Sequence, residues 1–185
     1  MQERNNEHQD EHHDEHGDKG GDGHEGEGAR VLIERLGLAP HPEGGWYREL
    51  HRSMVAVERN GDGCRRSGLT LIAYLLEAGS CSRWHRVRGA DEIWQHVAGA
   101  PLRLWRLPPQ GGRSEALTLG PLSAERPELS AVQVVPADWW QAARSLGGWS
   151  LVTCCVGPGF DFADFALLRD RAEGPELPGA DPALR

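Results

Sequence analysis

From residue 69 onward the sequence is a succession of short apolar segments, four to eight residues long, separated by glycine, proline or polar residues. Valine, leucine, isoleucine and tryptophan dominate these segments, and no helical pattern lies between them. Short strands at this spacing are typical of antiparallel sandwiches and barrels. Eight strands suit a double-sheet jelly roll, although the pattern alone does not separate it from other β-sandwiches. The predicted strands are 69–76, 82–86, 91–97, 102–107, 116–119, 131–135, 139–143 and 149–156.

One short helix is predicted before these strands. Residues 29–36 carry its apolar side chains, Gly37 follows as a residue that commonly ends helices, and Pro40 lies just beyond. Together with the strands, this helix forms a body of residues 29–171. A body of this length buries roughly 68–70% of its unfolded surface, so we predict one domain.

The two ends of the chain differ from this body. Residues 1–28 hold ten acidic, two basic and five histidine residues, and their net charge of 2 − 10 = −8 equals that of the whole chain. Met1 is their only apolar side chain, so they cannot offset the entropy of ordering. We predict a disordered, acidic, histidine-rich tail, which solvates the protein or weakly binds metal ions. Residues 172–185, with three prolines, are predicted to be a second disordered tail.

Composition excludes several classes of partner. The body is electrically balanced, whereas nucleic-acid binders need a basic surface. The longest apolar run, 71–76, is far too short to span a membrane, and the N-terminus lacks a signal-peptide pattern. The four cysteines show no C-x-x-C spacing, which favours reduced thiols. We therefore expect a cytoplasmic protein with no nucleic-acid and no membrane partner.

Residues 79–99 carry the side chains with the greatest chemical potential. Alternate residues of a strand share a face, so Glu92, Trp94 and His96 point the same way. A histidine partly desolvated near a carboxylate titrates near neutral pH, as proton transfer requires. If His85 joins this face, the segment predicts an acid–base pocket. The alternative is two hairpin strands with ordinary solvated side chains.

The spacing in this segment resembles the first motif of the cupin superfamily, Gly-x5-His-x-His-x3–4-Glu-x6-Gly. The positions that match are Gly79, His85, Glu92 and Gly99. Val87 stands where the motif has its second histidine. The second cupin motif is similar to residues 136–145, where Pro136 is retained and Gln141 replaces the histidine.

Further segments resemble the fifth cupin family, which was long labelled a domain of unknown function. They are residues 41–48, 51–53, 85–86, 91–94, 99–102, 135–137, 140–142, 158–162 and 164–165. The resemblance extends over about residues 31–168. It implies an all-β cupin double-stranded β-helix (jelly-roll barrel), similar to the deoxysugar epimerase of the rhamnose pathway and usually paired as a homodimer. It implies no particular reaction.

The resemblance also implies a position for a metal. Cupins use three histidines and one glutamate, and the corresponding residues here are His85, Val87, Glu92 and Gln141. Two good ligands and one amide make a poor site for a tightly held divalent ion. We therefore predict no firm cofactor, and keep a divalent metal bound by His85, Glu92 and Gln141 as an alternative.

We predict that the barrel binds a small polar molecule, carbohydrate-like or nucleotide-like. His85, Glu92 and His96 are the candidate catalytic residues of an isomerase or epimerase using acid–base chemistry. The paired glycines after Glu43 permit close approach of the chain, and indole walls suit sugar-like ligands. The candidate ligand-binding residues are Glu43, Arg48, Trp94, Trp139 and Gln141. The alternatives are a non-catalytic metabolite-binding cupin and a metal-dependent cupin enzyme with an incomplete ligand set.

Overall fold

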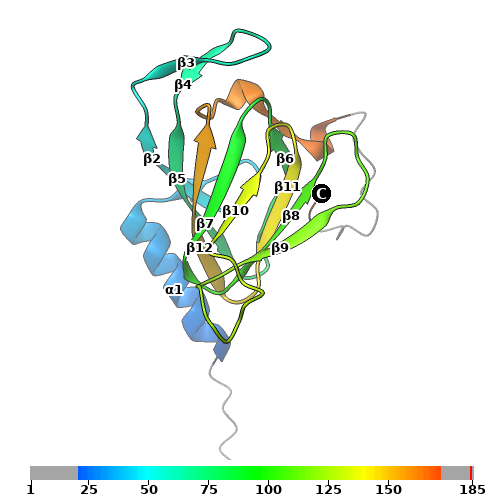
Figure 1. The fold of residues 1–185 in the computed structure, drawn as a ribbon. Helices are drawn as coiled ribbons and strands as arrows, with labels where there is room; N and C mark the ends of the chain where they lie inside the picture. Colours follow the sequence, from blue (N-terminus) through cyan, green and yellow to red (C-terminus); the bar gives the residue numbers. More distant parts are fainter. Residues whose placement is uncertain (1–20, 172–183, 185) are drawn as a thin grey trace, which may run out of the picture.

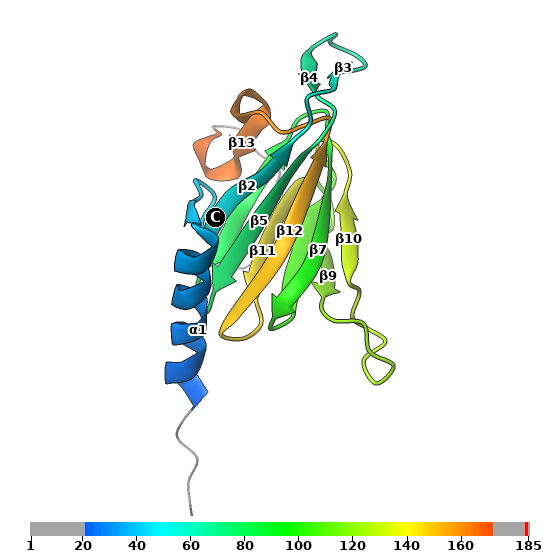
Figure 2. The same cartoon turned by 90° about the vertical axis from the view of Figure 1, so that its left-hand side faces the viewer.

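The computed structural model describes residues 21–171 and residue 184, with side chains from residue 26 onward. Two antiparallel sheets face each other, with one helix outside (Figures 1 and 2). One sheet has six strands in the order β1-β2-β5-β12-β7-β10, and the other has five in the order β13-β6-β11-β8-β9. The predicted all-β jelly-roll barrel with a short N-terminal helix is confirmed.

The elements follow one another along the chain with short connections. Their bounds are α1 (Gly21–Leu36), β1 (Ala39–Pro40), β2 (Trp46–Arg52), β3 (Ala56–Glu58), β4 (Arg65–Ser67), β5 (Thr70–Glu77), β6 (Cys81–Val87), β7 (Asp91–Gly99), β8 (Leu102–Leu107), β9 (Glu115–Leu119), β10 (Val132–Val135), β11 (Trp140–Ser145), β12 (Trp149–Gly157), the 3-10 turn η1 (Phe162–Asp164), β13 (Phe165–Leu167) and the 3-10 turn η2 (Leu168–Asp170).

All eight predicted strands are present, as β5 to β12. Their apolar alternation reflects burial: in β12, every second residue from Ser150 to Val156 is buried. Strands β1 to β4 and β13 were not predicted. The reason is visible in β2, whose residues from Arg48 onward are all exposed and mostly charged, so the strand carries no apolar alternation.

The interior between the sheets is apolar at one end. Tyr74, Trp94, Leu104 and Val152 are buried there at the centre of the largest core cluster. Helix α1 lies at one side of the six-stranded sheet (Figure 2), where Ala29 and its apolar neighbours pack on Ala73 and Leu75 of β5 and on Trp149 and Leu151 of β12.

Helix α1 is longer than the sequence predicts, because it begins at Gly21 and not at residue 29. Its first two turns carry no apolar side chains, so hydrophobic periodicity could not detect them. The absence of a side chain at Gly28 has a packing reason, since a Cβ there would lie 3.1 Å from Nε1 of Trp149.

A buried ion-pair network fixes the β3–β4 hairpin to the end of the barrel. Asp164 of η1 is 5% exposed, and its carboxylate pairs with Arg59 at 2.9 Å, Arg66 at 2.8 Å and Arg88 at 3.3 Å. These contacts tie the hairpin to the segment that precedes β13. Because that segment lines the cavity described below, the network helps to define the cavity mouth.

The predicted disordered tails lie mostly outside the described residues, which exclude 1–20, 172–183 and 185. Leu184 is described, and it is 1% exposed, in contrast to the tail predicted there. The four cysteines are free thiols. Across residues 21–171, the helical segments are too short or too polar to cross a membrane.

Candidate active site

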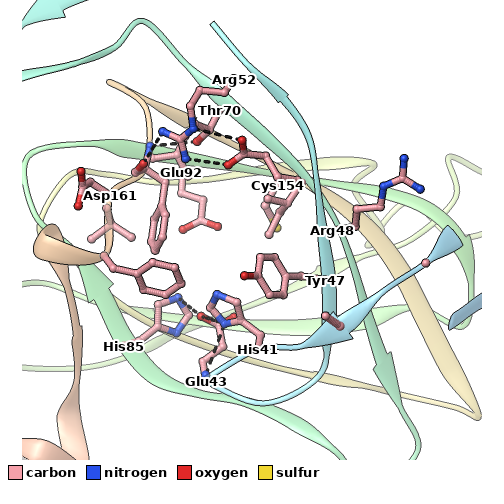
Figure 3. Close-up of a pocket in the computed structure, with 18 residues that line it drawn as sticks. His41, Glu43, Tyr47, Arg48, Arg52, Thr70, His85, Glu92, Cys154 and Asp161 are labelled. Carbon is pink, nitrogen blue, oxygen red and sulfur yellow. Dashed lines mark hydrogen bonds and ion pairs between the residues drawn. The ribbon is translucent and has the colours of Figure 1, made fainter.

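A cavity of about 470 Å³ lies beside the apolar core, and Cys154, Tyr47 and Ile72 adjoin both (Figure 3). Side chains from β2, β5, β6, β7 and β12 line it, together with the turn before β2 and the segment around Phe160 and Phe162. Its volume lies within the range of roughly 300–1,000 Å³ that is usual for small-molecule sites. Its lining includes the buried side chains of His85, Glu43 and Glu92, which are 2%, 6% and 7% exposed.

His85 and Glu43 form one hydrogen-bonded unit on the wall of this cavity. Nε2 of His85 lies 3.2 Å from Oε2 of Glu43, and its Nδ1 lies 2.8 Å from the carbonyl oxygen of Arg83. A carbonyl and a carboxylate both accept hydrogen bonds, so the doubly protonated imidazolium satisfies both. Ser82 donates to Oε1 of Glu43 at 2.9 Å, and Nδ1 of His41 lies 3.4 Å from Oε2.

These contacts keep the Glu43 carboxylate ionised. Burial opposes ionisation, but the charge of His85 and the hydrogen bonds of His41 and Ser82 outweigh it and lower the pKa of Glu43 to about 2.

Two glycines bring Glu43 into the barrel. Gly44 and Gly45 have φ values of +112° and +67°, which residues with a side chain rarely adopt. A Cβ on Gly44 would lie 2.1 Å from the carbonyl oxygen of Cys81, and one on Gly45 would lie 2.7 Å from Leu76. The turn is closed by the amide of His41, which donates to Gly45 at 3.0 Å, and the Tyr74 hydroxyl donates to the Gly44 carbonyl at 2.7 Å.

Glu92 lies across the cavity from this unit and has the opposite electrostatic character (Figure 3). Burial makes the largest contribution and raises the pKa of its carboxyl group. The charge of His85 comes next and lowers it, the charge of Glu43 raises it, and the hydrogen bonds of Gln141 and Cys154 lower it, so that the pKa is raised overall. The amide nitrogen of Gln141 donates to Oε2 of Glu92 at 2.6 Å. Nε1 of Trp94 in turn donates to Oε1 of Gln141 at 2.9 Å, which fixes the orientation of the amide.

Comparison with known proteins identifies the family of this barrel. Residues 30–168 match the family model described as "Cupin superfamily (DUF985)". The chain belongs to this cupin family. A comparison with curated proteins finds no relative.

Solved structures agree with this assignment. A hypothetical protein from Leishmania major is 36% identical with a TM-score of 0.67, over 75% of this cupin and 85% of that chain. Protein SO0799 from Shewanella oneidensis is 34% identical with a TM-score of 0.66, over 75% and 83%. Oxalate decarboxylase from Bacillus subtilis is 17% identical with a TM-score of 0.51, over 71% and 30%. This last likeness shows the fold alone.

The structure brings some of the predicted site residues of this cupin together. His85 and Glu92, matched by the first cupin motif, and Glu43 line the cavity. Arg48 also lines it near the mouth, where its guanidinium donates to the carbonyl oxygen of Leu36 at 2.8 Å and so binds the end of α1.

Trp94 and Gln141, predicted to bind a ligand, lie behind Glu92 and are not part of the cavity lining. Both are 1% exposed, and their polar groups are bonded to each other and to Glu92. Trp139 packs against the core and stacks with Arg106, whose guanidinium carbon lies 5.6 Å from the ring centroid. It is not part of the cavity either.

The prediction that His96 joins Glu92 in the pocket is wrong. The two residues share strand parity, but four residues of strand separate them by about 13 Å. The apolar core fills the barrel at that level. The Nε2 atom of His96 lies 3.1 Å from the carbonyl oxygen of Ala100, near a β-bulge where the register between β7 and β12 shifts.

Several cavity residues were not predicted from the sequence, among them His41, Tyr47 and Cys154. His41 stacks edge-on against Tyr47, with ring centroids 4.6 Å apart. Strand alternation could have located Cys154, because it faces the interior of the barrel and is buried, whereas its neighbour Cys155 is not. The aromatic wall includes Phe160 and Phe162, which pack edge to face with centroids 5.0 Å apart.

The donor set does not fit the metal that the cupin superfamily implies. Both polar ends of the Gln141 amide are engaged, by Trp94 and Glu92, and both nitrogens of His85 face oxygen acceptors. Val87, at the position of the second histidine, adds an apolar surface. Among residues 26–171 and 184, no three His, Cys, Asp or Glu side chains are grouped as a metal site. We therefore assign no chemistry here to a metal.

Proposed function

We propose that this cupin binds a small polar, carbohydrate-like or nucleotide-like metabolite in the cavity and epimerises or isomerises it by acid–base chemistry. The observation that carries the proposal is the pair of buried carboxyl groups with opposite pKa shifts, Glu43 lowered and Glu92 raised, around one imidazole. Such divergence of two neighbouring carboxyl groups separates a carboxylate that stabilises charge from a carboxyl group that exchanges a proton.

The roles follow from the hydrogen bonds. Glu92 is the candidate base, which accepts a proton from a carbon next to a substrate carbonyl, because its raised pKa makes the carboxylate more basic and Gln141 holds it in place. His85 is the candidate acid, because its two nitrogens face oxygen acceptors and the doubly protonated ring has a proton to give. The Glu43 carboxylate, 3.2 Å from Nε2, stabilises this imidazolium.

The two proton carriers lie on different sides of the cavity (Figure 3). Epimerisation needs this arrangement, since the proton leaves one face of the carbon and another returns to the opposite face. The carbon–hydrogen bond breaks toward the Glu92 carboxylate, and its electron pair moves into the carbonyl as an enolate. A new carbon–hydrogen bond forms with a proton from His85, and proton exchange with water returns both groups to their starting states. The aromatic side chains Tyr47, Phe160 and Phe162 provide apolar area for a sugar ring.

The test is incorporation of deuterium from D₂O into free and nucleotide-linked keto sugars, followed by proton NMR. We expect the wild type to exchange a proton next to the carbonyl of one member, and Glu92→Gln and His85→Asn to lose this exchange. Glu49→Gln is the matched control, because Glu49 lines the mouth and is exposed, with its carboxylate paired to Arg52 at 2.7 Å. Exchange that survives in both cavity variants would contradict the proposal.

A second candidate function is non-catalytic binding of a metabolite. It is favoured by the hydrogen bonds of His85, Glu43 and Gln141, which are satisfied within the protein. It predicts saturable binding of a panel member, weakened by Glu92→Gln, without deuterium exchange in the wild type.

A further inference from the structure

The outer face of the five-stranded sheet carries a second aromatic cluster, separate from the cavity. Trp84 and Trp140 adjoin His85 and Gln141 along β6 and β11, so they project from the opposite face of the sheet. Both indoles are only 1% exposed. They form one buried cluster with Leu107, Ala142 and Leu168, which we call the Leu184 socket.

The socket is named after the side chain that completes this cluster. Leu184 is the penultimate residue of the chain and is nevertheless 1% exposed. Residues this close to a terminus are usually solvated unless they are held down. The thirteen residues that follow Arg171 span at most roughly 43–47 Å when extended, which is ample to return to the sheet.

Positive charge surrounds the socket. The guanidinium carbon of Arg86 lies 5.0 Å from the ring centroid of Trp140. Burial lowers the pKa of Arg86, and the charges of Arg171 and Arg88 add to this effect, with Asp138 opposing it. The segment 172–185 contains three acidic residues and one basic residue, Arg185. Its net negative charge is therefore complementary to that of the face on which Leu184 lies.

We propose that the Leu184 socket and Arg86 form a docking site for the acidic C-terminal segment of the same chain, residues 172–185, with Leu184 as its anchor. Leu168 of the socket directly follows β13, in which Leu167 pairs with His85 and Phe165 packs 5.5 Å from the His85 ring. The docked segment therefore holds in place the edge strand beside the cavity. This proposal does not depend on the proposed function.

The test uses full-length Leu184→Asp protein and a labelled synthetic peptide of residues 172–185. Leu177→Asp is the matched control, a leucine-to-aspartate change in the same segment. We expect Leu184→Asp, and not the control, to shift tryptophan emission to the red, because Trp84 and Trp140 lose their cover. The variant should bind the peptide, and a peptide carrying the same Leu184→Asp change should bind on the order of ten-fold more weakly or worse. Higher salt should weaken binding.

Three results would overturn the proposal. The first is equal binding of the two peptides, and the second is identical emission spectra for Leu184→Asp and Leu177→Asp. The third is a smaller oligomer for Leu184→Asp than for the control in light scattering, because the segment would then dock on a second copy. If the aspartate variant does not fold, Leu184→Ala replaces it in the same peptide assay, with the same criteria.

Discussion

Replacing Glu43 by glutamine should reveal how much the ionised carboxylate stabilises the folded state. The pKa of Glu43 falls from an ordinary value near 4.5 to about 2. At 1.36 kcal/mol per pKa unit, this shift corresponds to about 3 kcal/mol of stability. The side chain is 6% exposed, so solvent screening is small. Glutamine keeps the shape of the side chain and removes the charge.

The lowered pKa of Glu43 determines how the stability difference between wild type and Glu43→Gln changes with pH. A carboxyl group whose pKa is lowered by folding contributes stability above its unfolded pKa, and the contribution is lost as pH falls toward the folded pKa. The difference in free energy of unfolding between wild type and Glu43→Gln should therefore be about 3 kcal/mol at pH 7. It should fall to about 1.5 kcal/mol at pH 3 and vanish below about pH 2.

Urea unfolding of both proteins, followed by circular dichroism at several pH values, measures this difference. Glu34→Gln, at an exposed position of α1, is the control and should match the wild type throughout. In a His85→Asn background the effect of Glu43→Gln should shrink, because His85 is the largest of the favourable contributions. A difference that stays constant from pH 7 to pH 3 would show that packing, and not the charge, is responsible.

Three further predictions concern the core, the second carboxyl group and the assembly. Trp94→Ala should lower the free energy of unfolding by about 3–5 kcal/mol in urea, because the ring is 1% exposed and packs edge to face on Tyr74; a loss below 1 kcal/mol would contradict this. Glu92→Gln should become more stable than the wild type as pH rises above the pKa of Glu92 in the unfolded chain, because the raised pKa of Glu92 makes its ionisation costly in the folded state. Thermal unfolding at acidic and alkaline pH measures this difference in stability, and a variant less stable than the wild type at alkaline pH would refute the prediction. We propose that the protein is a homodimer and that residues 1–20 are not needed for folding or for dimer formation. Deleting them should leave the melting temperature within a few degrees of the wild type and the mass measured by light scattering that of a dimer. A monomeric mass would contradict the proposal.

The sequence predicts the strands well wherever burial imposes a pattern. Each of the strands β5 to β12 carries buried apolar side chains and lies between turn residues. The edge elements are different. Strand β2 is mostly exposed, and β3–β4 is a small charged hairpin, so neither leaves an apolar pattern. Their positions are determined by long-range contacts such as the pairs of Asp164 with Arg59 and Arg66.

Strand parity predicts which face of the sheet a side chain lies on, but not how far along the barrel it lies. The candidate site was therefore predictable only in part. Parity correctly placed Glu92 inside the barrel, and the cupin resemblance placed His85 there. The same parity rule put His96 in the cavity, where the length of the strand excludes it. Gln141 was expected to touch a ligand, but two buried neighbours already satisfy its amide. Neither contact can be read from one strand, because each joins residues far apart in the sequence.

The partner of His85 shows why this cupin differs from the metal pattern of its superfamily. The motif positions that would supply further ligands hold Val87, which cannot coordinate, and Gln141, which is fully bonded. The group that faces Nε2 of His85 comes instead from Glu43, in a glycine turn outside both cupin motifs. A buried imidazole needs a charged or polar partner, and a carboxylate favours the protonated ring. The glycine turn thus replaces a metal-binding arrangement with one that carries a proton. Gly44→Ala, whose Cβ would lie 2.1 Å from a carbonyl oxygen, would displace this partner.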